Sequence, residues 1–360
     1  MSIFHLRNNS SDDSFPKFTK PKIIGYFSLN SERSWSQDAK QLGYYYPLSK
    51  LQNKINFDLN QGIDNVIRKA SNLDEKIDHL LRWIKLNSDK LTTTPDSKKW
   101  IDADFVIYRG QLTKIMKSLY DFKEGWILCA VKFKGTIYIC SFDTDEDKAA
   151  AENITPQQKQ FMSWGFKFEK YLLTNDPTVP PQPEKPVNEN EEFDCVFTTR
   201  LNDKKILYGA EVDGLYSNEK INEPLPLDRL SFVELKTSKT IYNNHQQRTL
   251  EKYKFLRWWC QSFLVGIEDI LCGFRNDNGI IESIQQFQVS QMGRNYKHYW
   301  SAGKCMNLLD NFLQFVKNNV LEDYDNKIYV FERMPFEDIK VTTASPHSKY
   351  AFLPTWFTQQ

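Results

Sequence analysis

Two short segments of the sequence carry charged residues at a spacing that could bind a metal ion. Glu211 and Asp213 flank a valine, and Glu234 and Lys236 flank a leucine. In an extended strand, residues two positions apart point to the same face, so each segment would present its charged side chains together. Carboxylates gathered on one face repel each other, and a hard cation such as Mg²⁺ or Mn²⁺ relieves that repulsion.

The interval between Asp213 and Glu234 is long enough for a loop and a return to the neighbouring strand. We therefore expect Glu211, Asp213, Glu234 and Lys236 to converge on one patch of a sheet. Acids that hold a metal, beside a lysine that positions the nucleophile or offsets developing charge, suit phosphodiester hydrolysis. The order D-x(n)-E-x-K resembles the signature of restriction-endonuclease-like nucleases. Each pair alone is more often a solvated strand face, on which Lys236 pairs with an acid at little energetic gain.

The elements that must position these residues are predicted from hydrophobic periodicity. Strands are expected at 105–108, 126–133, 136–142, 193–201, 205–215, 229–237, 270–275, 281–289 and 327–332. Helices are expected at 65–91, 248–266 and 305–321. Grouped strands with interspersed helices predict an α+β fold, a single domain of mixed β-sheets flanked by helices with a restriction-endonuclease-like active-site arrangement.

Two polar segments complete the predicted organisation. Residues 1–20 are rich in Ser, Asn and Asp and are expected to be disordered, which leaves residues 21–360 as one catalytic domain. Residues 174–192 are rich in Pro, Asn and Glu and are expected to form a long surface loop inside that domain.

Composition limits the classes of function. The 47 Lys and Arg against 46 Asp and Glu give a net charge of +1, which favours a local site over a surface that coats nucleic acid. The six cysteines form no C-x-x-C pair, so no zinc site or disulfide framework is legible and a reducing compartment is expected. There is no P-loop or G-x-G-x-x-G motif of a nucleotide-cofactor enzyme, and no apolar run of membrane-spanning length.

A wider set of motifs resembles the DXO family of RNA 5′-end decapping nucleases, which includes fungal nuclear members that associate with a 5′→3′ exoribonuclease. With Φ for an apolar residue, the family's ordered motifs are an Arg segment, G-Φ-x-Φ-E, E-Φ-D, E-Φ-K and a later Gln. In that order, this chain carries Arg109 between Tyr108 and Gly110, then Gly165–Glu169, Glu211–Asp213, Glu234–Lys236 and Gln261. The ordered set is specific, although each piece alone is weak.

The resemblance implies a role for each of these residues. Direct metal ligands would be Glu169, Asp213, Glu234 and the backbone carbonyl of Leu235, and Glu211 would bind metal directly or through water. Lys236 and Gln261 would contact the scissile phosphate or the nucleophile, and Arg109 would line the RNA or cap pocket. Without the resemblance, Arg109 would be interpreted as a charged residue at a strand end. Glu169 would be interpreted as an exposed acid, and Gln261 as a polar residue of a helix.

The predicted function is a metal-dependent RNA 5′-end hydrolase that removes caps or 5′ pyrophosphate, with NAD-type caps included. The resemblance implies Mg²⁺ or Mn²⁺, two ions, a nuclear location and an exoribonuclease partner. No residue in the sequence decides which 5′ end is preferred. Two alternatives stay open: a non-catalytic stabilising partner of a 5′→3′ exoribonuclease, and a DNA nuclease of the restriction-endonuclease-like class.

Overall fold

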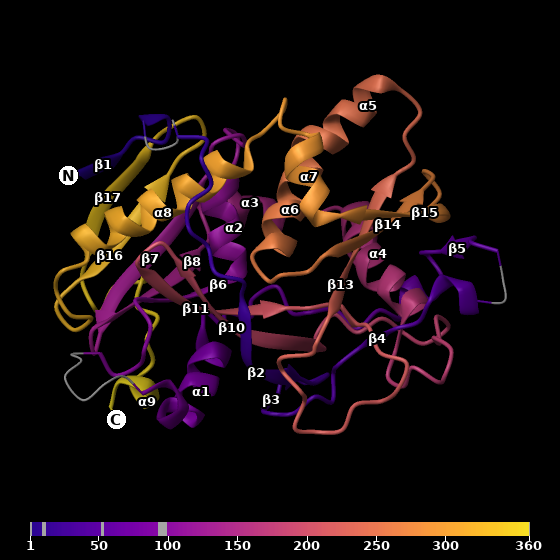
Figure 1. The fold of residues 1–360 in the computed structure, drawn as a ribbon, viewed down its shortest axis with the longest axis horizontal. Coiled ribbons are helices and arrows are strands. Elements are labelled where there is room, and N and C mark those ends of the chain that lie inside the picture. The colour runs from indigo at the N-terminus through magenta and orange to yellow at the C-terminus, as the bar shows by residue number, and fades with distance from the viewer. Residues whose placement is uncertain (1, 9–11, 52–53, 93–98, 360) are drawn as a thin grey trace.

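A computed structural model of the chain describes residues 2–8, 12–51, 54–92 and 99–359. Within these residues the strands form two mixed sheets, one of ten strands and one of seven, seen on the left and right of Figure 1. The ten-stranded sheet contains, in spatial order, β1 (Ser2–Phe4), β17 (Ile339–Ala344), β16 (Ile328–Arg333), β7 (Trp126–Phe133), β8 (Thr136–Phe142), β6 (Phe105–Tyr108), β11 (Lys204–Glu211), β10 (Glu192–Leu201), β2 (Lys22–Leu29) and β3 (Trp35–Ser36).

The seven-stranded sheet is built from shorter and more scattered segments. In spatial order it contains β5 (Phe57–Asp58), β15 (Ile280–Gln288), β14 (Asp269–Arg275), β13 (Phe232–Lys239), β12 (Gly214–Leu215), β4 (Tyr44–Tyr45) and β9 (Leu173–Thr174). Both sheets mix parallel and antiparallel pairs: β6 runs parallel to β11, and β13 runs parallel to β14.

Helices cover the faces of both sheets. They are α1 (Asp78–Leu86), α2 (Arg109–Lys117), α3 (Asp145–Glu152), α4 (Pro156–Leu172), α5 (Asn244–Thr249), α6 (Phe255–Phe263), α7 (Val289–Asn295), α8 (Ala302–Asn319) and α9 (Thr355–Thr358). A π-helical turn, η5 (Leu250–Lys254), joins α5 to α6. None of the helices in the described part of the chain combines the length and the apolar character that a membrane crossing needs.

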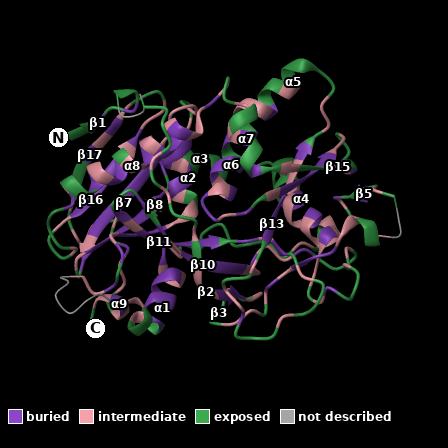
Figure 2. Cartoon of the chain, viewed as in Figure 1, coloured by how far each residue is buried: buried purple, intermediate pink, exposed green. Residues whose placement is uncertain are grey.

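The central strands are buried on both faces, as the purple strands of Figure 2 show. In β7, Leu128 and Ala130 belong to the hydrophobic cluster that contains α2, α6 and α8, whereas Ile127 and Cys129 belong to the cluster that contains α1 and α9. Alternate side chains of β7 thus pack into two different cores, one on each face of the sheet. This explains why the sequence of β7 is a continuous apolar run.

The sequence located the long strands β7, β8, β10, β11 and β13–β16 and the helix α8, but it did not predict α2, α3, α4 or α7, and one helix prediction was wrong. Only Asp78–Leu86 of the predicted 65–91 helix is α-helical, and Ile67 and Leu73 are 49% and 40% exposed. The backbone of Ile67 instead donates to the carbonyl of Val187 and accepts from the amide of Glu189, both at 2.9 Å. These tertiary hydrogen bonds to the proline-rich loop override the local helical spacing.

The expectation of a disordered N-terminus is not met for the described part of residues 1–20; residues 1 and 9–11 lie outside the described residues. Ser2–Phe4 pairs with β17 at the edge of the ten-stranded sheet. Phe4 and Leu6 are buried in the core, and their burial outweighs the polar composition of the segment.

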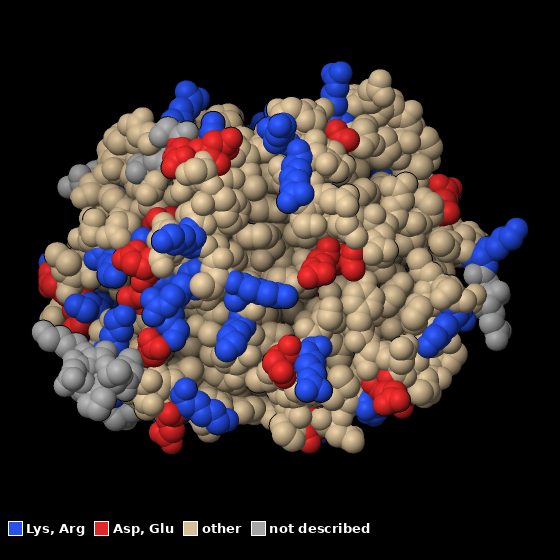
Figure 3. All heavy atoms as spheres, viewed as in Figure 1, with Lys and Arg blue, Asp and Glu red and all other residues tan. Residues whose placement is uncertain are grey.

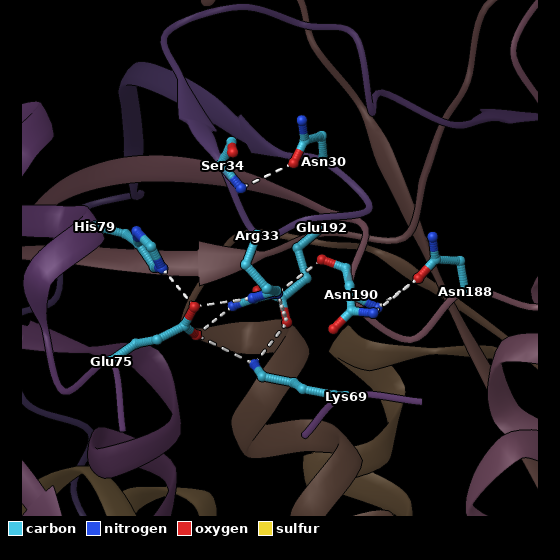
Figure 4. Close-up of polar contacts among 9 residues, drawn as sticks. All are labelled: Asn30, Arg33, Ser34, Lys69, Glu75, His79, Asn188, Asn190 and Glu192. Carbon is cyan, nitrogen blue, oxygen red and sulfur yellow. Dashed lines mark hydrogen bonds and ion pairs between the residues drawn. The ribbon is translucent and has the colours of Figure 1, made fainter. Parts of the chain in front are cut away.

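Basic and acidic side chains are interspersed over the face seen in Figure 3, in keeping with the near-neutral net charge. One cluster of ionic contacts holds the irregular segment before α1 against β10 (Figure 4). Arg33 donates to Glu75 through Nε at 2.9 Å and also through Nη2, and its Nη1 lies 2.8 Å from Glu192. Lys69 contacts the same two carboxylates at 3.4 and 3.2 Å. The cluster therefore fixes the first residue of β10.

Replacing Arg33 with Ala should lower the free energy of unfolding by ~1–3 kcal/mol at neutral pH, because two carboxylates lose their main partner. Burial raises the pKa of Glu75, but hydrogen bonds from Arg33 and His79 outweigh it and hold this pKa at about 2, below its ordinary 4.5. That stabilisation is complete above pH 4.5 and is lost as the pH falls through about 2.

Urea denaturation across pH 2–7 measures the difference between wild type and Arg33→Ala. The difference should shrink towards low pH, and Arg33→Lys, which keeps the charge without the forked contact, should lie between the two. A difference that stays constant with pH would contradict the assigned ionic role.

Candidate metal centre and active site

The predicted acidic residues meet where the two sheets join. Glu211 is the last residue of β11 in the ten-stranded sheet, whereas Gly214 begins β12 in the seven-stranded sheet. Glu234 and Lys236 lie on β13, which pairs with β12. The expectation of one patch on one sheet was therefore wrong. The chain crosses between sheets at Asp213, and the side chains approach one another from both.

Helix α4 supplies the fifth charged residue. The helix begins with a capping box at Thr155, followed by Pro156 at its first position. Its apolar residues Trp164, Phe168 and Leu172 are buried against the seven-stranded sheet. Glu169, next to Phe168, is half-buried and faces the junction, so the apolar face of the helix fixes its place.

Two hollows open on either side of Glu169, which lines both. The acidic hollow has a volume of about 270 Å³, and the carboxylates that line it are Glu169, Glu191, Glu192, Glu211 and Asp213. The basic hollow has a volume of about 470 Å³, and its lining includes Glu169, Leu235, Lys236, Lys254, Arg257 and Gln261. The structure thus brings every predicted metal ligand except Glu234 to the wall of one hollow or the other.

Glu234 lies behind this wall and is 2% exposed. Its Oε1 accepts a 2.5 Å hydrogen bond from Lys236 Nζ, and its Oε2 is buried without a hydrogen-bond partner in the described structure. Asp213 Oδ2 accepts a 2.6 Å hydrogen bond from the amide of Leu235. The E-Φ-D and E-Φ-K segments are therefore bonded directly to each other.

The protonation of these acids is strongly perturbed. Burial and the neighbouring Asp213 raise the pKa of Glu169 to about 8, and burial and Glu234 raise the pKa of Asp213 to about 6. Glu211 opens onto the acidic hollow, yet the surrounding protein atoms and Glu192 raise its pKa as well. Glu234 differs: burial acts to raise its pKa, but Lys236 outweighs burial and lowers it. Like charges are thus crowded together with one lysine to offset them.

The donor set fits a hard divalent cation, because it consists of carboxylate oxygens and one of them, Glu234 Oε2, is buried without a hydrogen-bond partner among the described residues. Among the described residues, however, no three His, Cys, Asp or Glu side chains already surround a common point closely enough to ligate an ion. Lys236 engages Glu234 Oε1, and the amide of Leu235 engages Asp213 Oδ2. The closure of the acids around an ion, and the predicted carbonyl ligand of Leu235, stay predictions.

Arg109 binds the backbone next to the site. Its Nη2 donates to the carbonyl of Glu211 at 2.9 Å and its Nη1 donates to the carbonyl of Gln261 at 3.1 Å. The guanidinium thereby links the end of β11 to α6. These two hydrogen bonds position the carboxylate of Glu211 on one side of Arg109 and the side-chain amide of Gln261 on the other. The predicted contact of Arg109 with RNA stays a prediction.

The sequence reasoning missed one buried carboxylate. Asp194 on β10 is directly opposite Glu211 on β11, is 5% exposed, and has a pKa raised to about 8 by burial and by Glu192. The two-residue turn at Asn202 and Asp203 fixes this register. Counting residues back from that turn pairs Asp194 with Glu211, and Glu192 and Asp194 share the E-x-D spacing. These two signals together could have predicted Asp194 as a site residue.

A mixed-sheet fold that gathers carboxylates and one lysine at a junction is the arrangement expected of a metal-dependent nuclease. The RAI1-like PD-(D/E)XK nuclease family model matches residues 19–358. The decapping and exoribonuclease protein of Xenopus laevis is 35% identical over 352 residues, which cover 96% of this chain and 86% of that protein. The decapping and exoribonuclease protein Rai1 of Drosophila melanogaster is 35% identical over 357 residues, covering 95% and 92%.

The chain therefore belongs to the RAI1-like PD-(D/E)XK nuclease family. Solved structures share its fold: Rai1 of Scheffersomyces stipitis, in complex with (3′-NADP)⁺ and calcium ion, has a TM-score of 0.84 at 20% identity and covers 100% of this chain and 99% of its own. Candida albicans Rai1, in complex with pU5-Mn²⁺, has a TM-score of 0.83 at 21% identity. The match covers 99% of this chain and 98% of that protein. The predicted fold class and the predicted hydrolytic nuclease family are confirmed.

Metal binding should depend on pH because the ligands must first lose protons. With the pKa of Glu169 at about 8 and that of Asp213 at about 6, the apparent affinity for Mn²⁺ should rise between pH 6 and 8, with release of protons. Calorimetry in buffers of different ionisation enthalpy measures both quantities.

The matched variant is Glu169→Gln, which keeps shape and removes the titrating group. Since the folded-state pKa of Glu169 lies above its ordinary 4.5, its contribution to the stability of the metal-free protein is present below pH 4.5 and is lost as the pH rises through about 8. The variant should flatten this decline and weaken Mn²⁺ binding. Wild-type affinity that does not change from pH 6 to 8 would contradict the assignment.

Proposed function

We propose that this chain hydrolyses the 5′ ends of RNA as a decapping nuclease and 5′-pyrophosphohydrolase, with NAD-type caps among its substrates. The observation that carries the proposal is the meeting of Lys236 with Glu169, Glu211, Asp213 and Glu234 at the sheet junction of a chain in this nuclease family. The two relatives described above are both named decapping and exoribonuclease proteins, which supports RNA 5′ ends as the substrate.

Each residue has a chemical task in this proposal. The four acids and the Leu235 carbonyl would hold a divalent cation, and such an ion would supply a lowered pKa for the attacking water and would offset charge on the phosphate. Water attacks the phosphorus atom, the bond to the leaving oxygen breaks, and the proton of the water is taken up by the acids or the solvent. Lys236 Nζ and the Gln261 amide, which both line the basic hollow, bind the phosphate oxygens as negative charge develops.

The number and identity of the metal ions, the protein partner and the cellular location are also proposed. The calcium and manganese in the structures of the yeast Rai1 proteins support a divalent cation, and we propose two ions of Mg²⁺ or Mn²⁺. A nuclear location and association with a 5′→3′ exoribonuclease are also proposed, from the family resemblance alone. Cell fractionation and co-purification with a purified exoribonuclease test these two points.

The function is tested by incubating the purified chain with the same RNA bearing a 5′ triphosphate, a guanosine cap, an NAD cap or a 5′ monophosphate. Products should appear with Mg²⁺ or Mn²⁺ and disappear with EDTA. A DNA strand of the same sequence separates RNA from DNA hydrolysis. Absence of product from every RNA would favour the non-catalytic alternative.

Lys236→Ala should lower turnover ~10²-fold or more while metal affinity stays largely intact, because the lysine acts on developing phosphate charge. Lys239→Ala is the matched control, since Lys239 is exposed on the same strand and pairs with Asp277. Replacing Glu211 and Asp213 together with Ala should instead remove metal binding and turnover without unfolding the chain. Equal turnover by Lys236→Ala and wild type would refute the role of this lysine.

A further inference from the structure

A third hollow lies on the side of α4 that faces away from the metal centre. Tyr171 contributes to its wall and follows Glu169 by two residues on this helix, so the two side chains point about 200° apart around the axis. The hollow has a volume of about 390 Å³, and its described lining shares no residue with the acidic or the basic hollow. We name it the proline hollow, because Pro180, Pro181 and Pro183 line it.

Rings form most of the lining of the proline hollow. Tyr46, Phe57 and Tyr171 are aromatic, and the three prolines add saturated rings. Phe57 of β5 and Tyr171 of α4 stack on each other, with ring centroids 4.5 Å apart and an angle of 4° between the planes. Both elements lie on the right of Figure 1. A lining of apolar and aromatic rings favours a ligand with a planar ring of its own, such as a nucleobase.

Hydrogen bonds hold the walls of the proline hollow in place. Lys167 is only 1% exposed and donates to the carbonyl of Pro183, which holds the proline segment against α4. The hydroxyl of Tyr171 donates to the carbonyl of Asp58 at 3.0 Å and to Gln61 Oε1 at 2.8 Å. Burying an ammonium group is costly, so its use here indicates that the position of this loop matters. The hollow is therefore pre-formed, as ligand pockets generally are.

The charged residues of this lining are both basic. Lys50 and Lys54 line the hollow and are exposed, and its described lining contains no Asp or Glu. Within the described ranges of the chain, neither lysine forms an ion pair with a carboxylate. Lys50 Nζ lies 5.9 Å from the ring centroid of Tyr46, which places a cation beside the aromatic wall. The complementary ligand is an anion with a flat apolar body.

We propose that the proline hollow is a second ligand site, which binds a purine nucleoside monophosphate. The base lies against the aromatic and proline rings, and the phosphate is bound by Lys50 and Lys54. Asn56 also lines the hollow, and its amide offers two donors and an acceptor to the edge of the base. A purine covers more of the apolar lining than a pyrimidine does. This site goes beyond the proposed hydrolysis, which uses the other side of α4.

The test is isothermal titration calorimetry of the whole chain in EDTA. The ligands are the 5′-monophosphates of adenosine and guanosine, the two nucleosides, and inorganic phosphate. The variant is the double substitution Lys50→Ala and Lys54→Ala. The first control is Lys185→Ala, an exposed lysine of the same loop outside the lining of the hollow. The second control is Lys236→Ala, which removes the cation of the metal centre.

Wild type should bind at least one monophosphate more tightly than its nucleoside and more tightly than inorganic phosphate, since base and phosphate both contribute. The double variant should lose about tenfold or more in affinity for that monophosphate, the scale of losing a hydrogen bond from a charged donor. Lys185→Ala and Lys236→Ala should match wild type. No binding of either monophosphate by wild type, or equal binding by the double variant, would overturn the inference.

A loss of affinity in Lys236→Ala alone would also overturn it, because the nucleotide would then occupy the metal centre. Replacing Lys50 and Lys54 together with Arg keeps both charges and should retain most of the affinity, whereas a loss equal to that of the Ala pair would contradict their role. Thermal denaturation of both double variants should match wild type, since the replaced side chains are exposed. Binding in EDTA requires no hydrolysis, so failure of the proposed function would leave this result unchanged.

Discussion

The crowding of like charge at the sheet junction is the constraint on which the rest of the structure depends. Glu169, Glu211 and Asp213 have pKa values raised by the surrounding protein atoms and by neighbouring acids, whereas Lys236 and Arg109 outweigh burial and lower the pKa of Glu234. Such a group is unstable in isolation, since each carboxylate would move into water or take up a proton. Their crowding at the junction, where Glu234 is buried and the other three line open hollows, is explained if the fold holds these residues for an ion that neutralises them.

The surrounding elements hold the acids from several directions. The apolar face of α4 fixes Glu169, and the hydrogen bond from the Leu235 amide fixes Asp213. Arg109 ties the end of β11 to α6, and the Arg33 cluster anchors the start of β10 beside them (Figure 4). Because these contacts come from both sheets and from two helices, the site forms only when the whole chain is folded. Supporting contacts of this kind keep charged groups where repulsion would separate them.

Local patterns predicted the chemistry better than they predicted the geometry. The pattern grouped Glu211 with Asp213 and Glu234 with Lys236, and the strands that carry Glu211, Glu234 and Lys236 were found because their apolar runs are strong. Asp213 lies just past the end of β11 and on no strand. The crossing between sheets at Asp213 was not predictable, since β12 is two residues long and leaves no periodic signal. The helix prediction for 65–91 failed for a related reason: backbone hydrogen bonds of Ile67 with Val187 and Glu189 join residues far apart in the sequence. Helix α4 was overlooked, although Thr155, Pro156 and Gln158 form a recognisable helix start.

The central claim is that the four carboxylates bind divalent metal between the two sheets. The most direct measurement is a crystal structure of the chain grown with Mn²⁺, using the anomalous scattering of manganese to locate the ions. The account predicts anomalous density within about 2.0–2.4 Å of oxygens from Glu169, Asp213 and Glu234, the oxygen distances typical of small divalent cations. Glu234 Oε2, which is buried and has no hydrogen-bond partner in the part of the chain that the structure describes, should then be a ligand. Density elsewhere, or none at the junction, would contradict it.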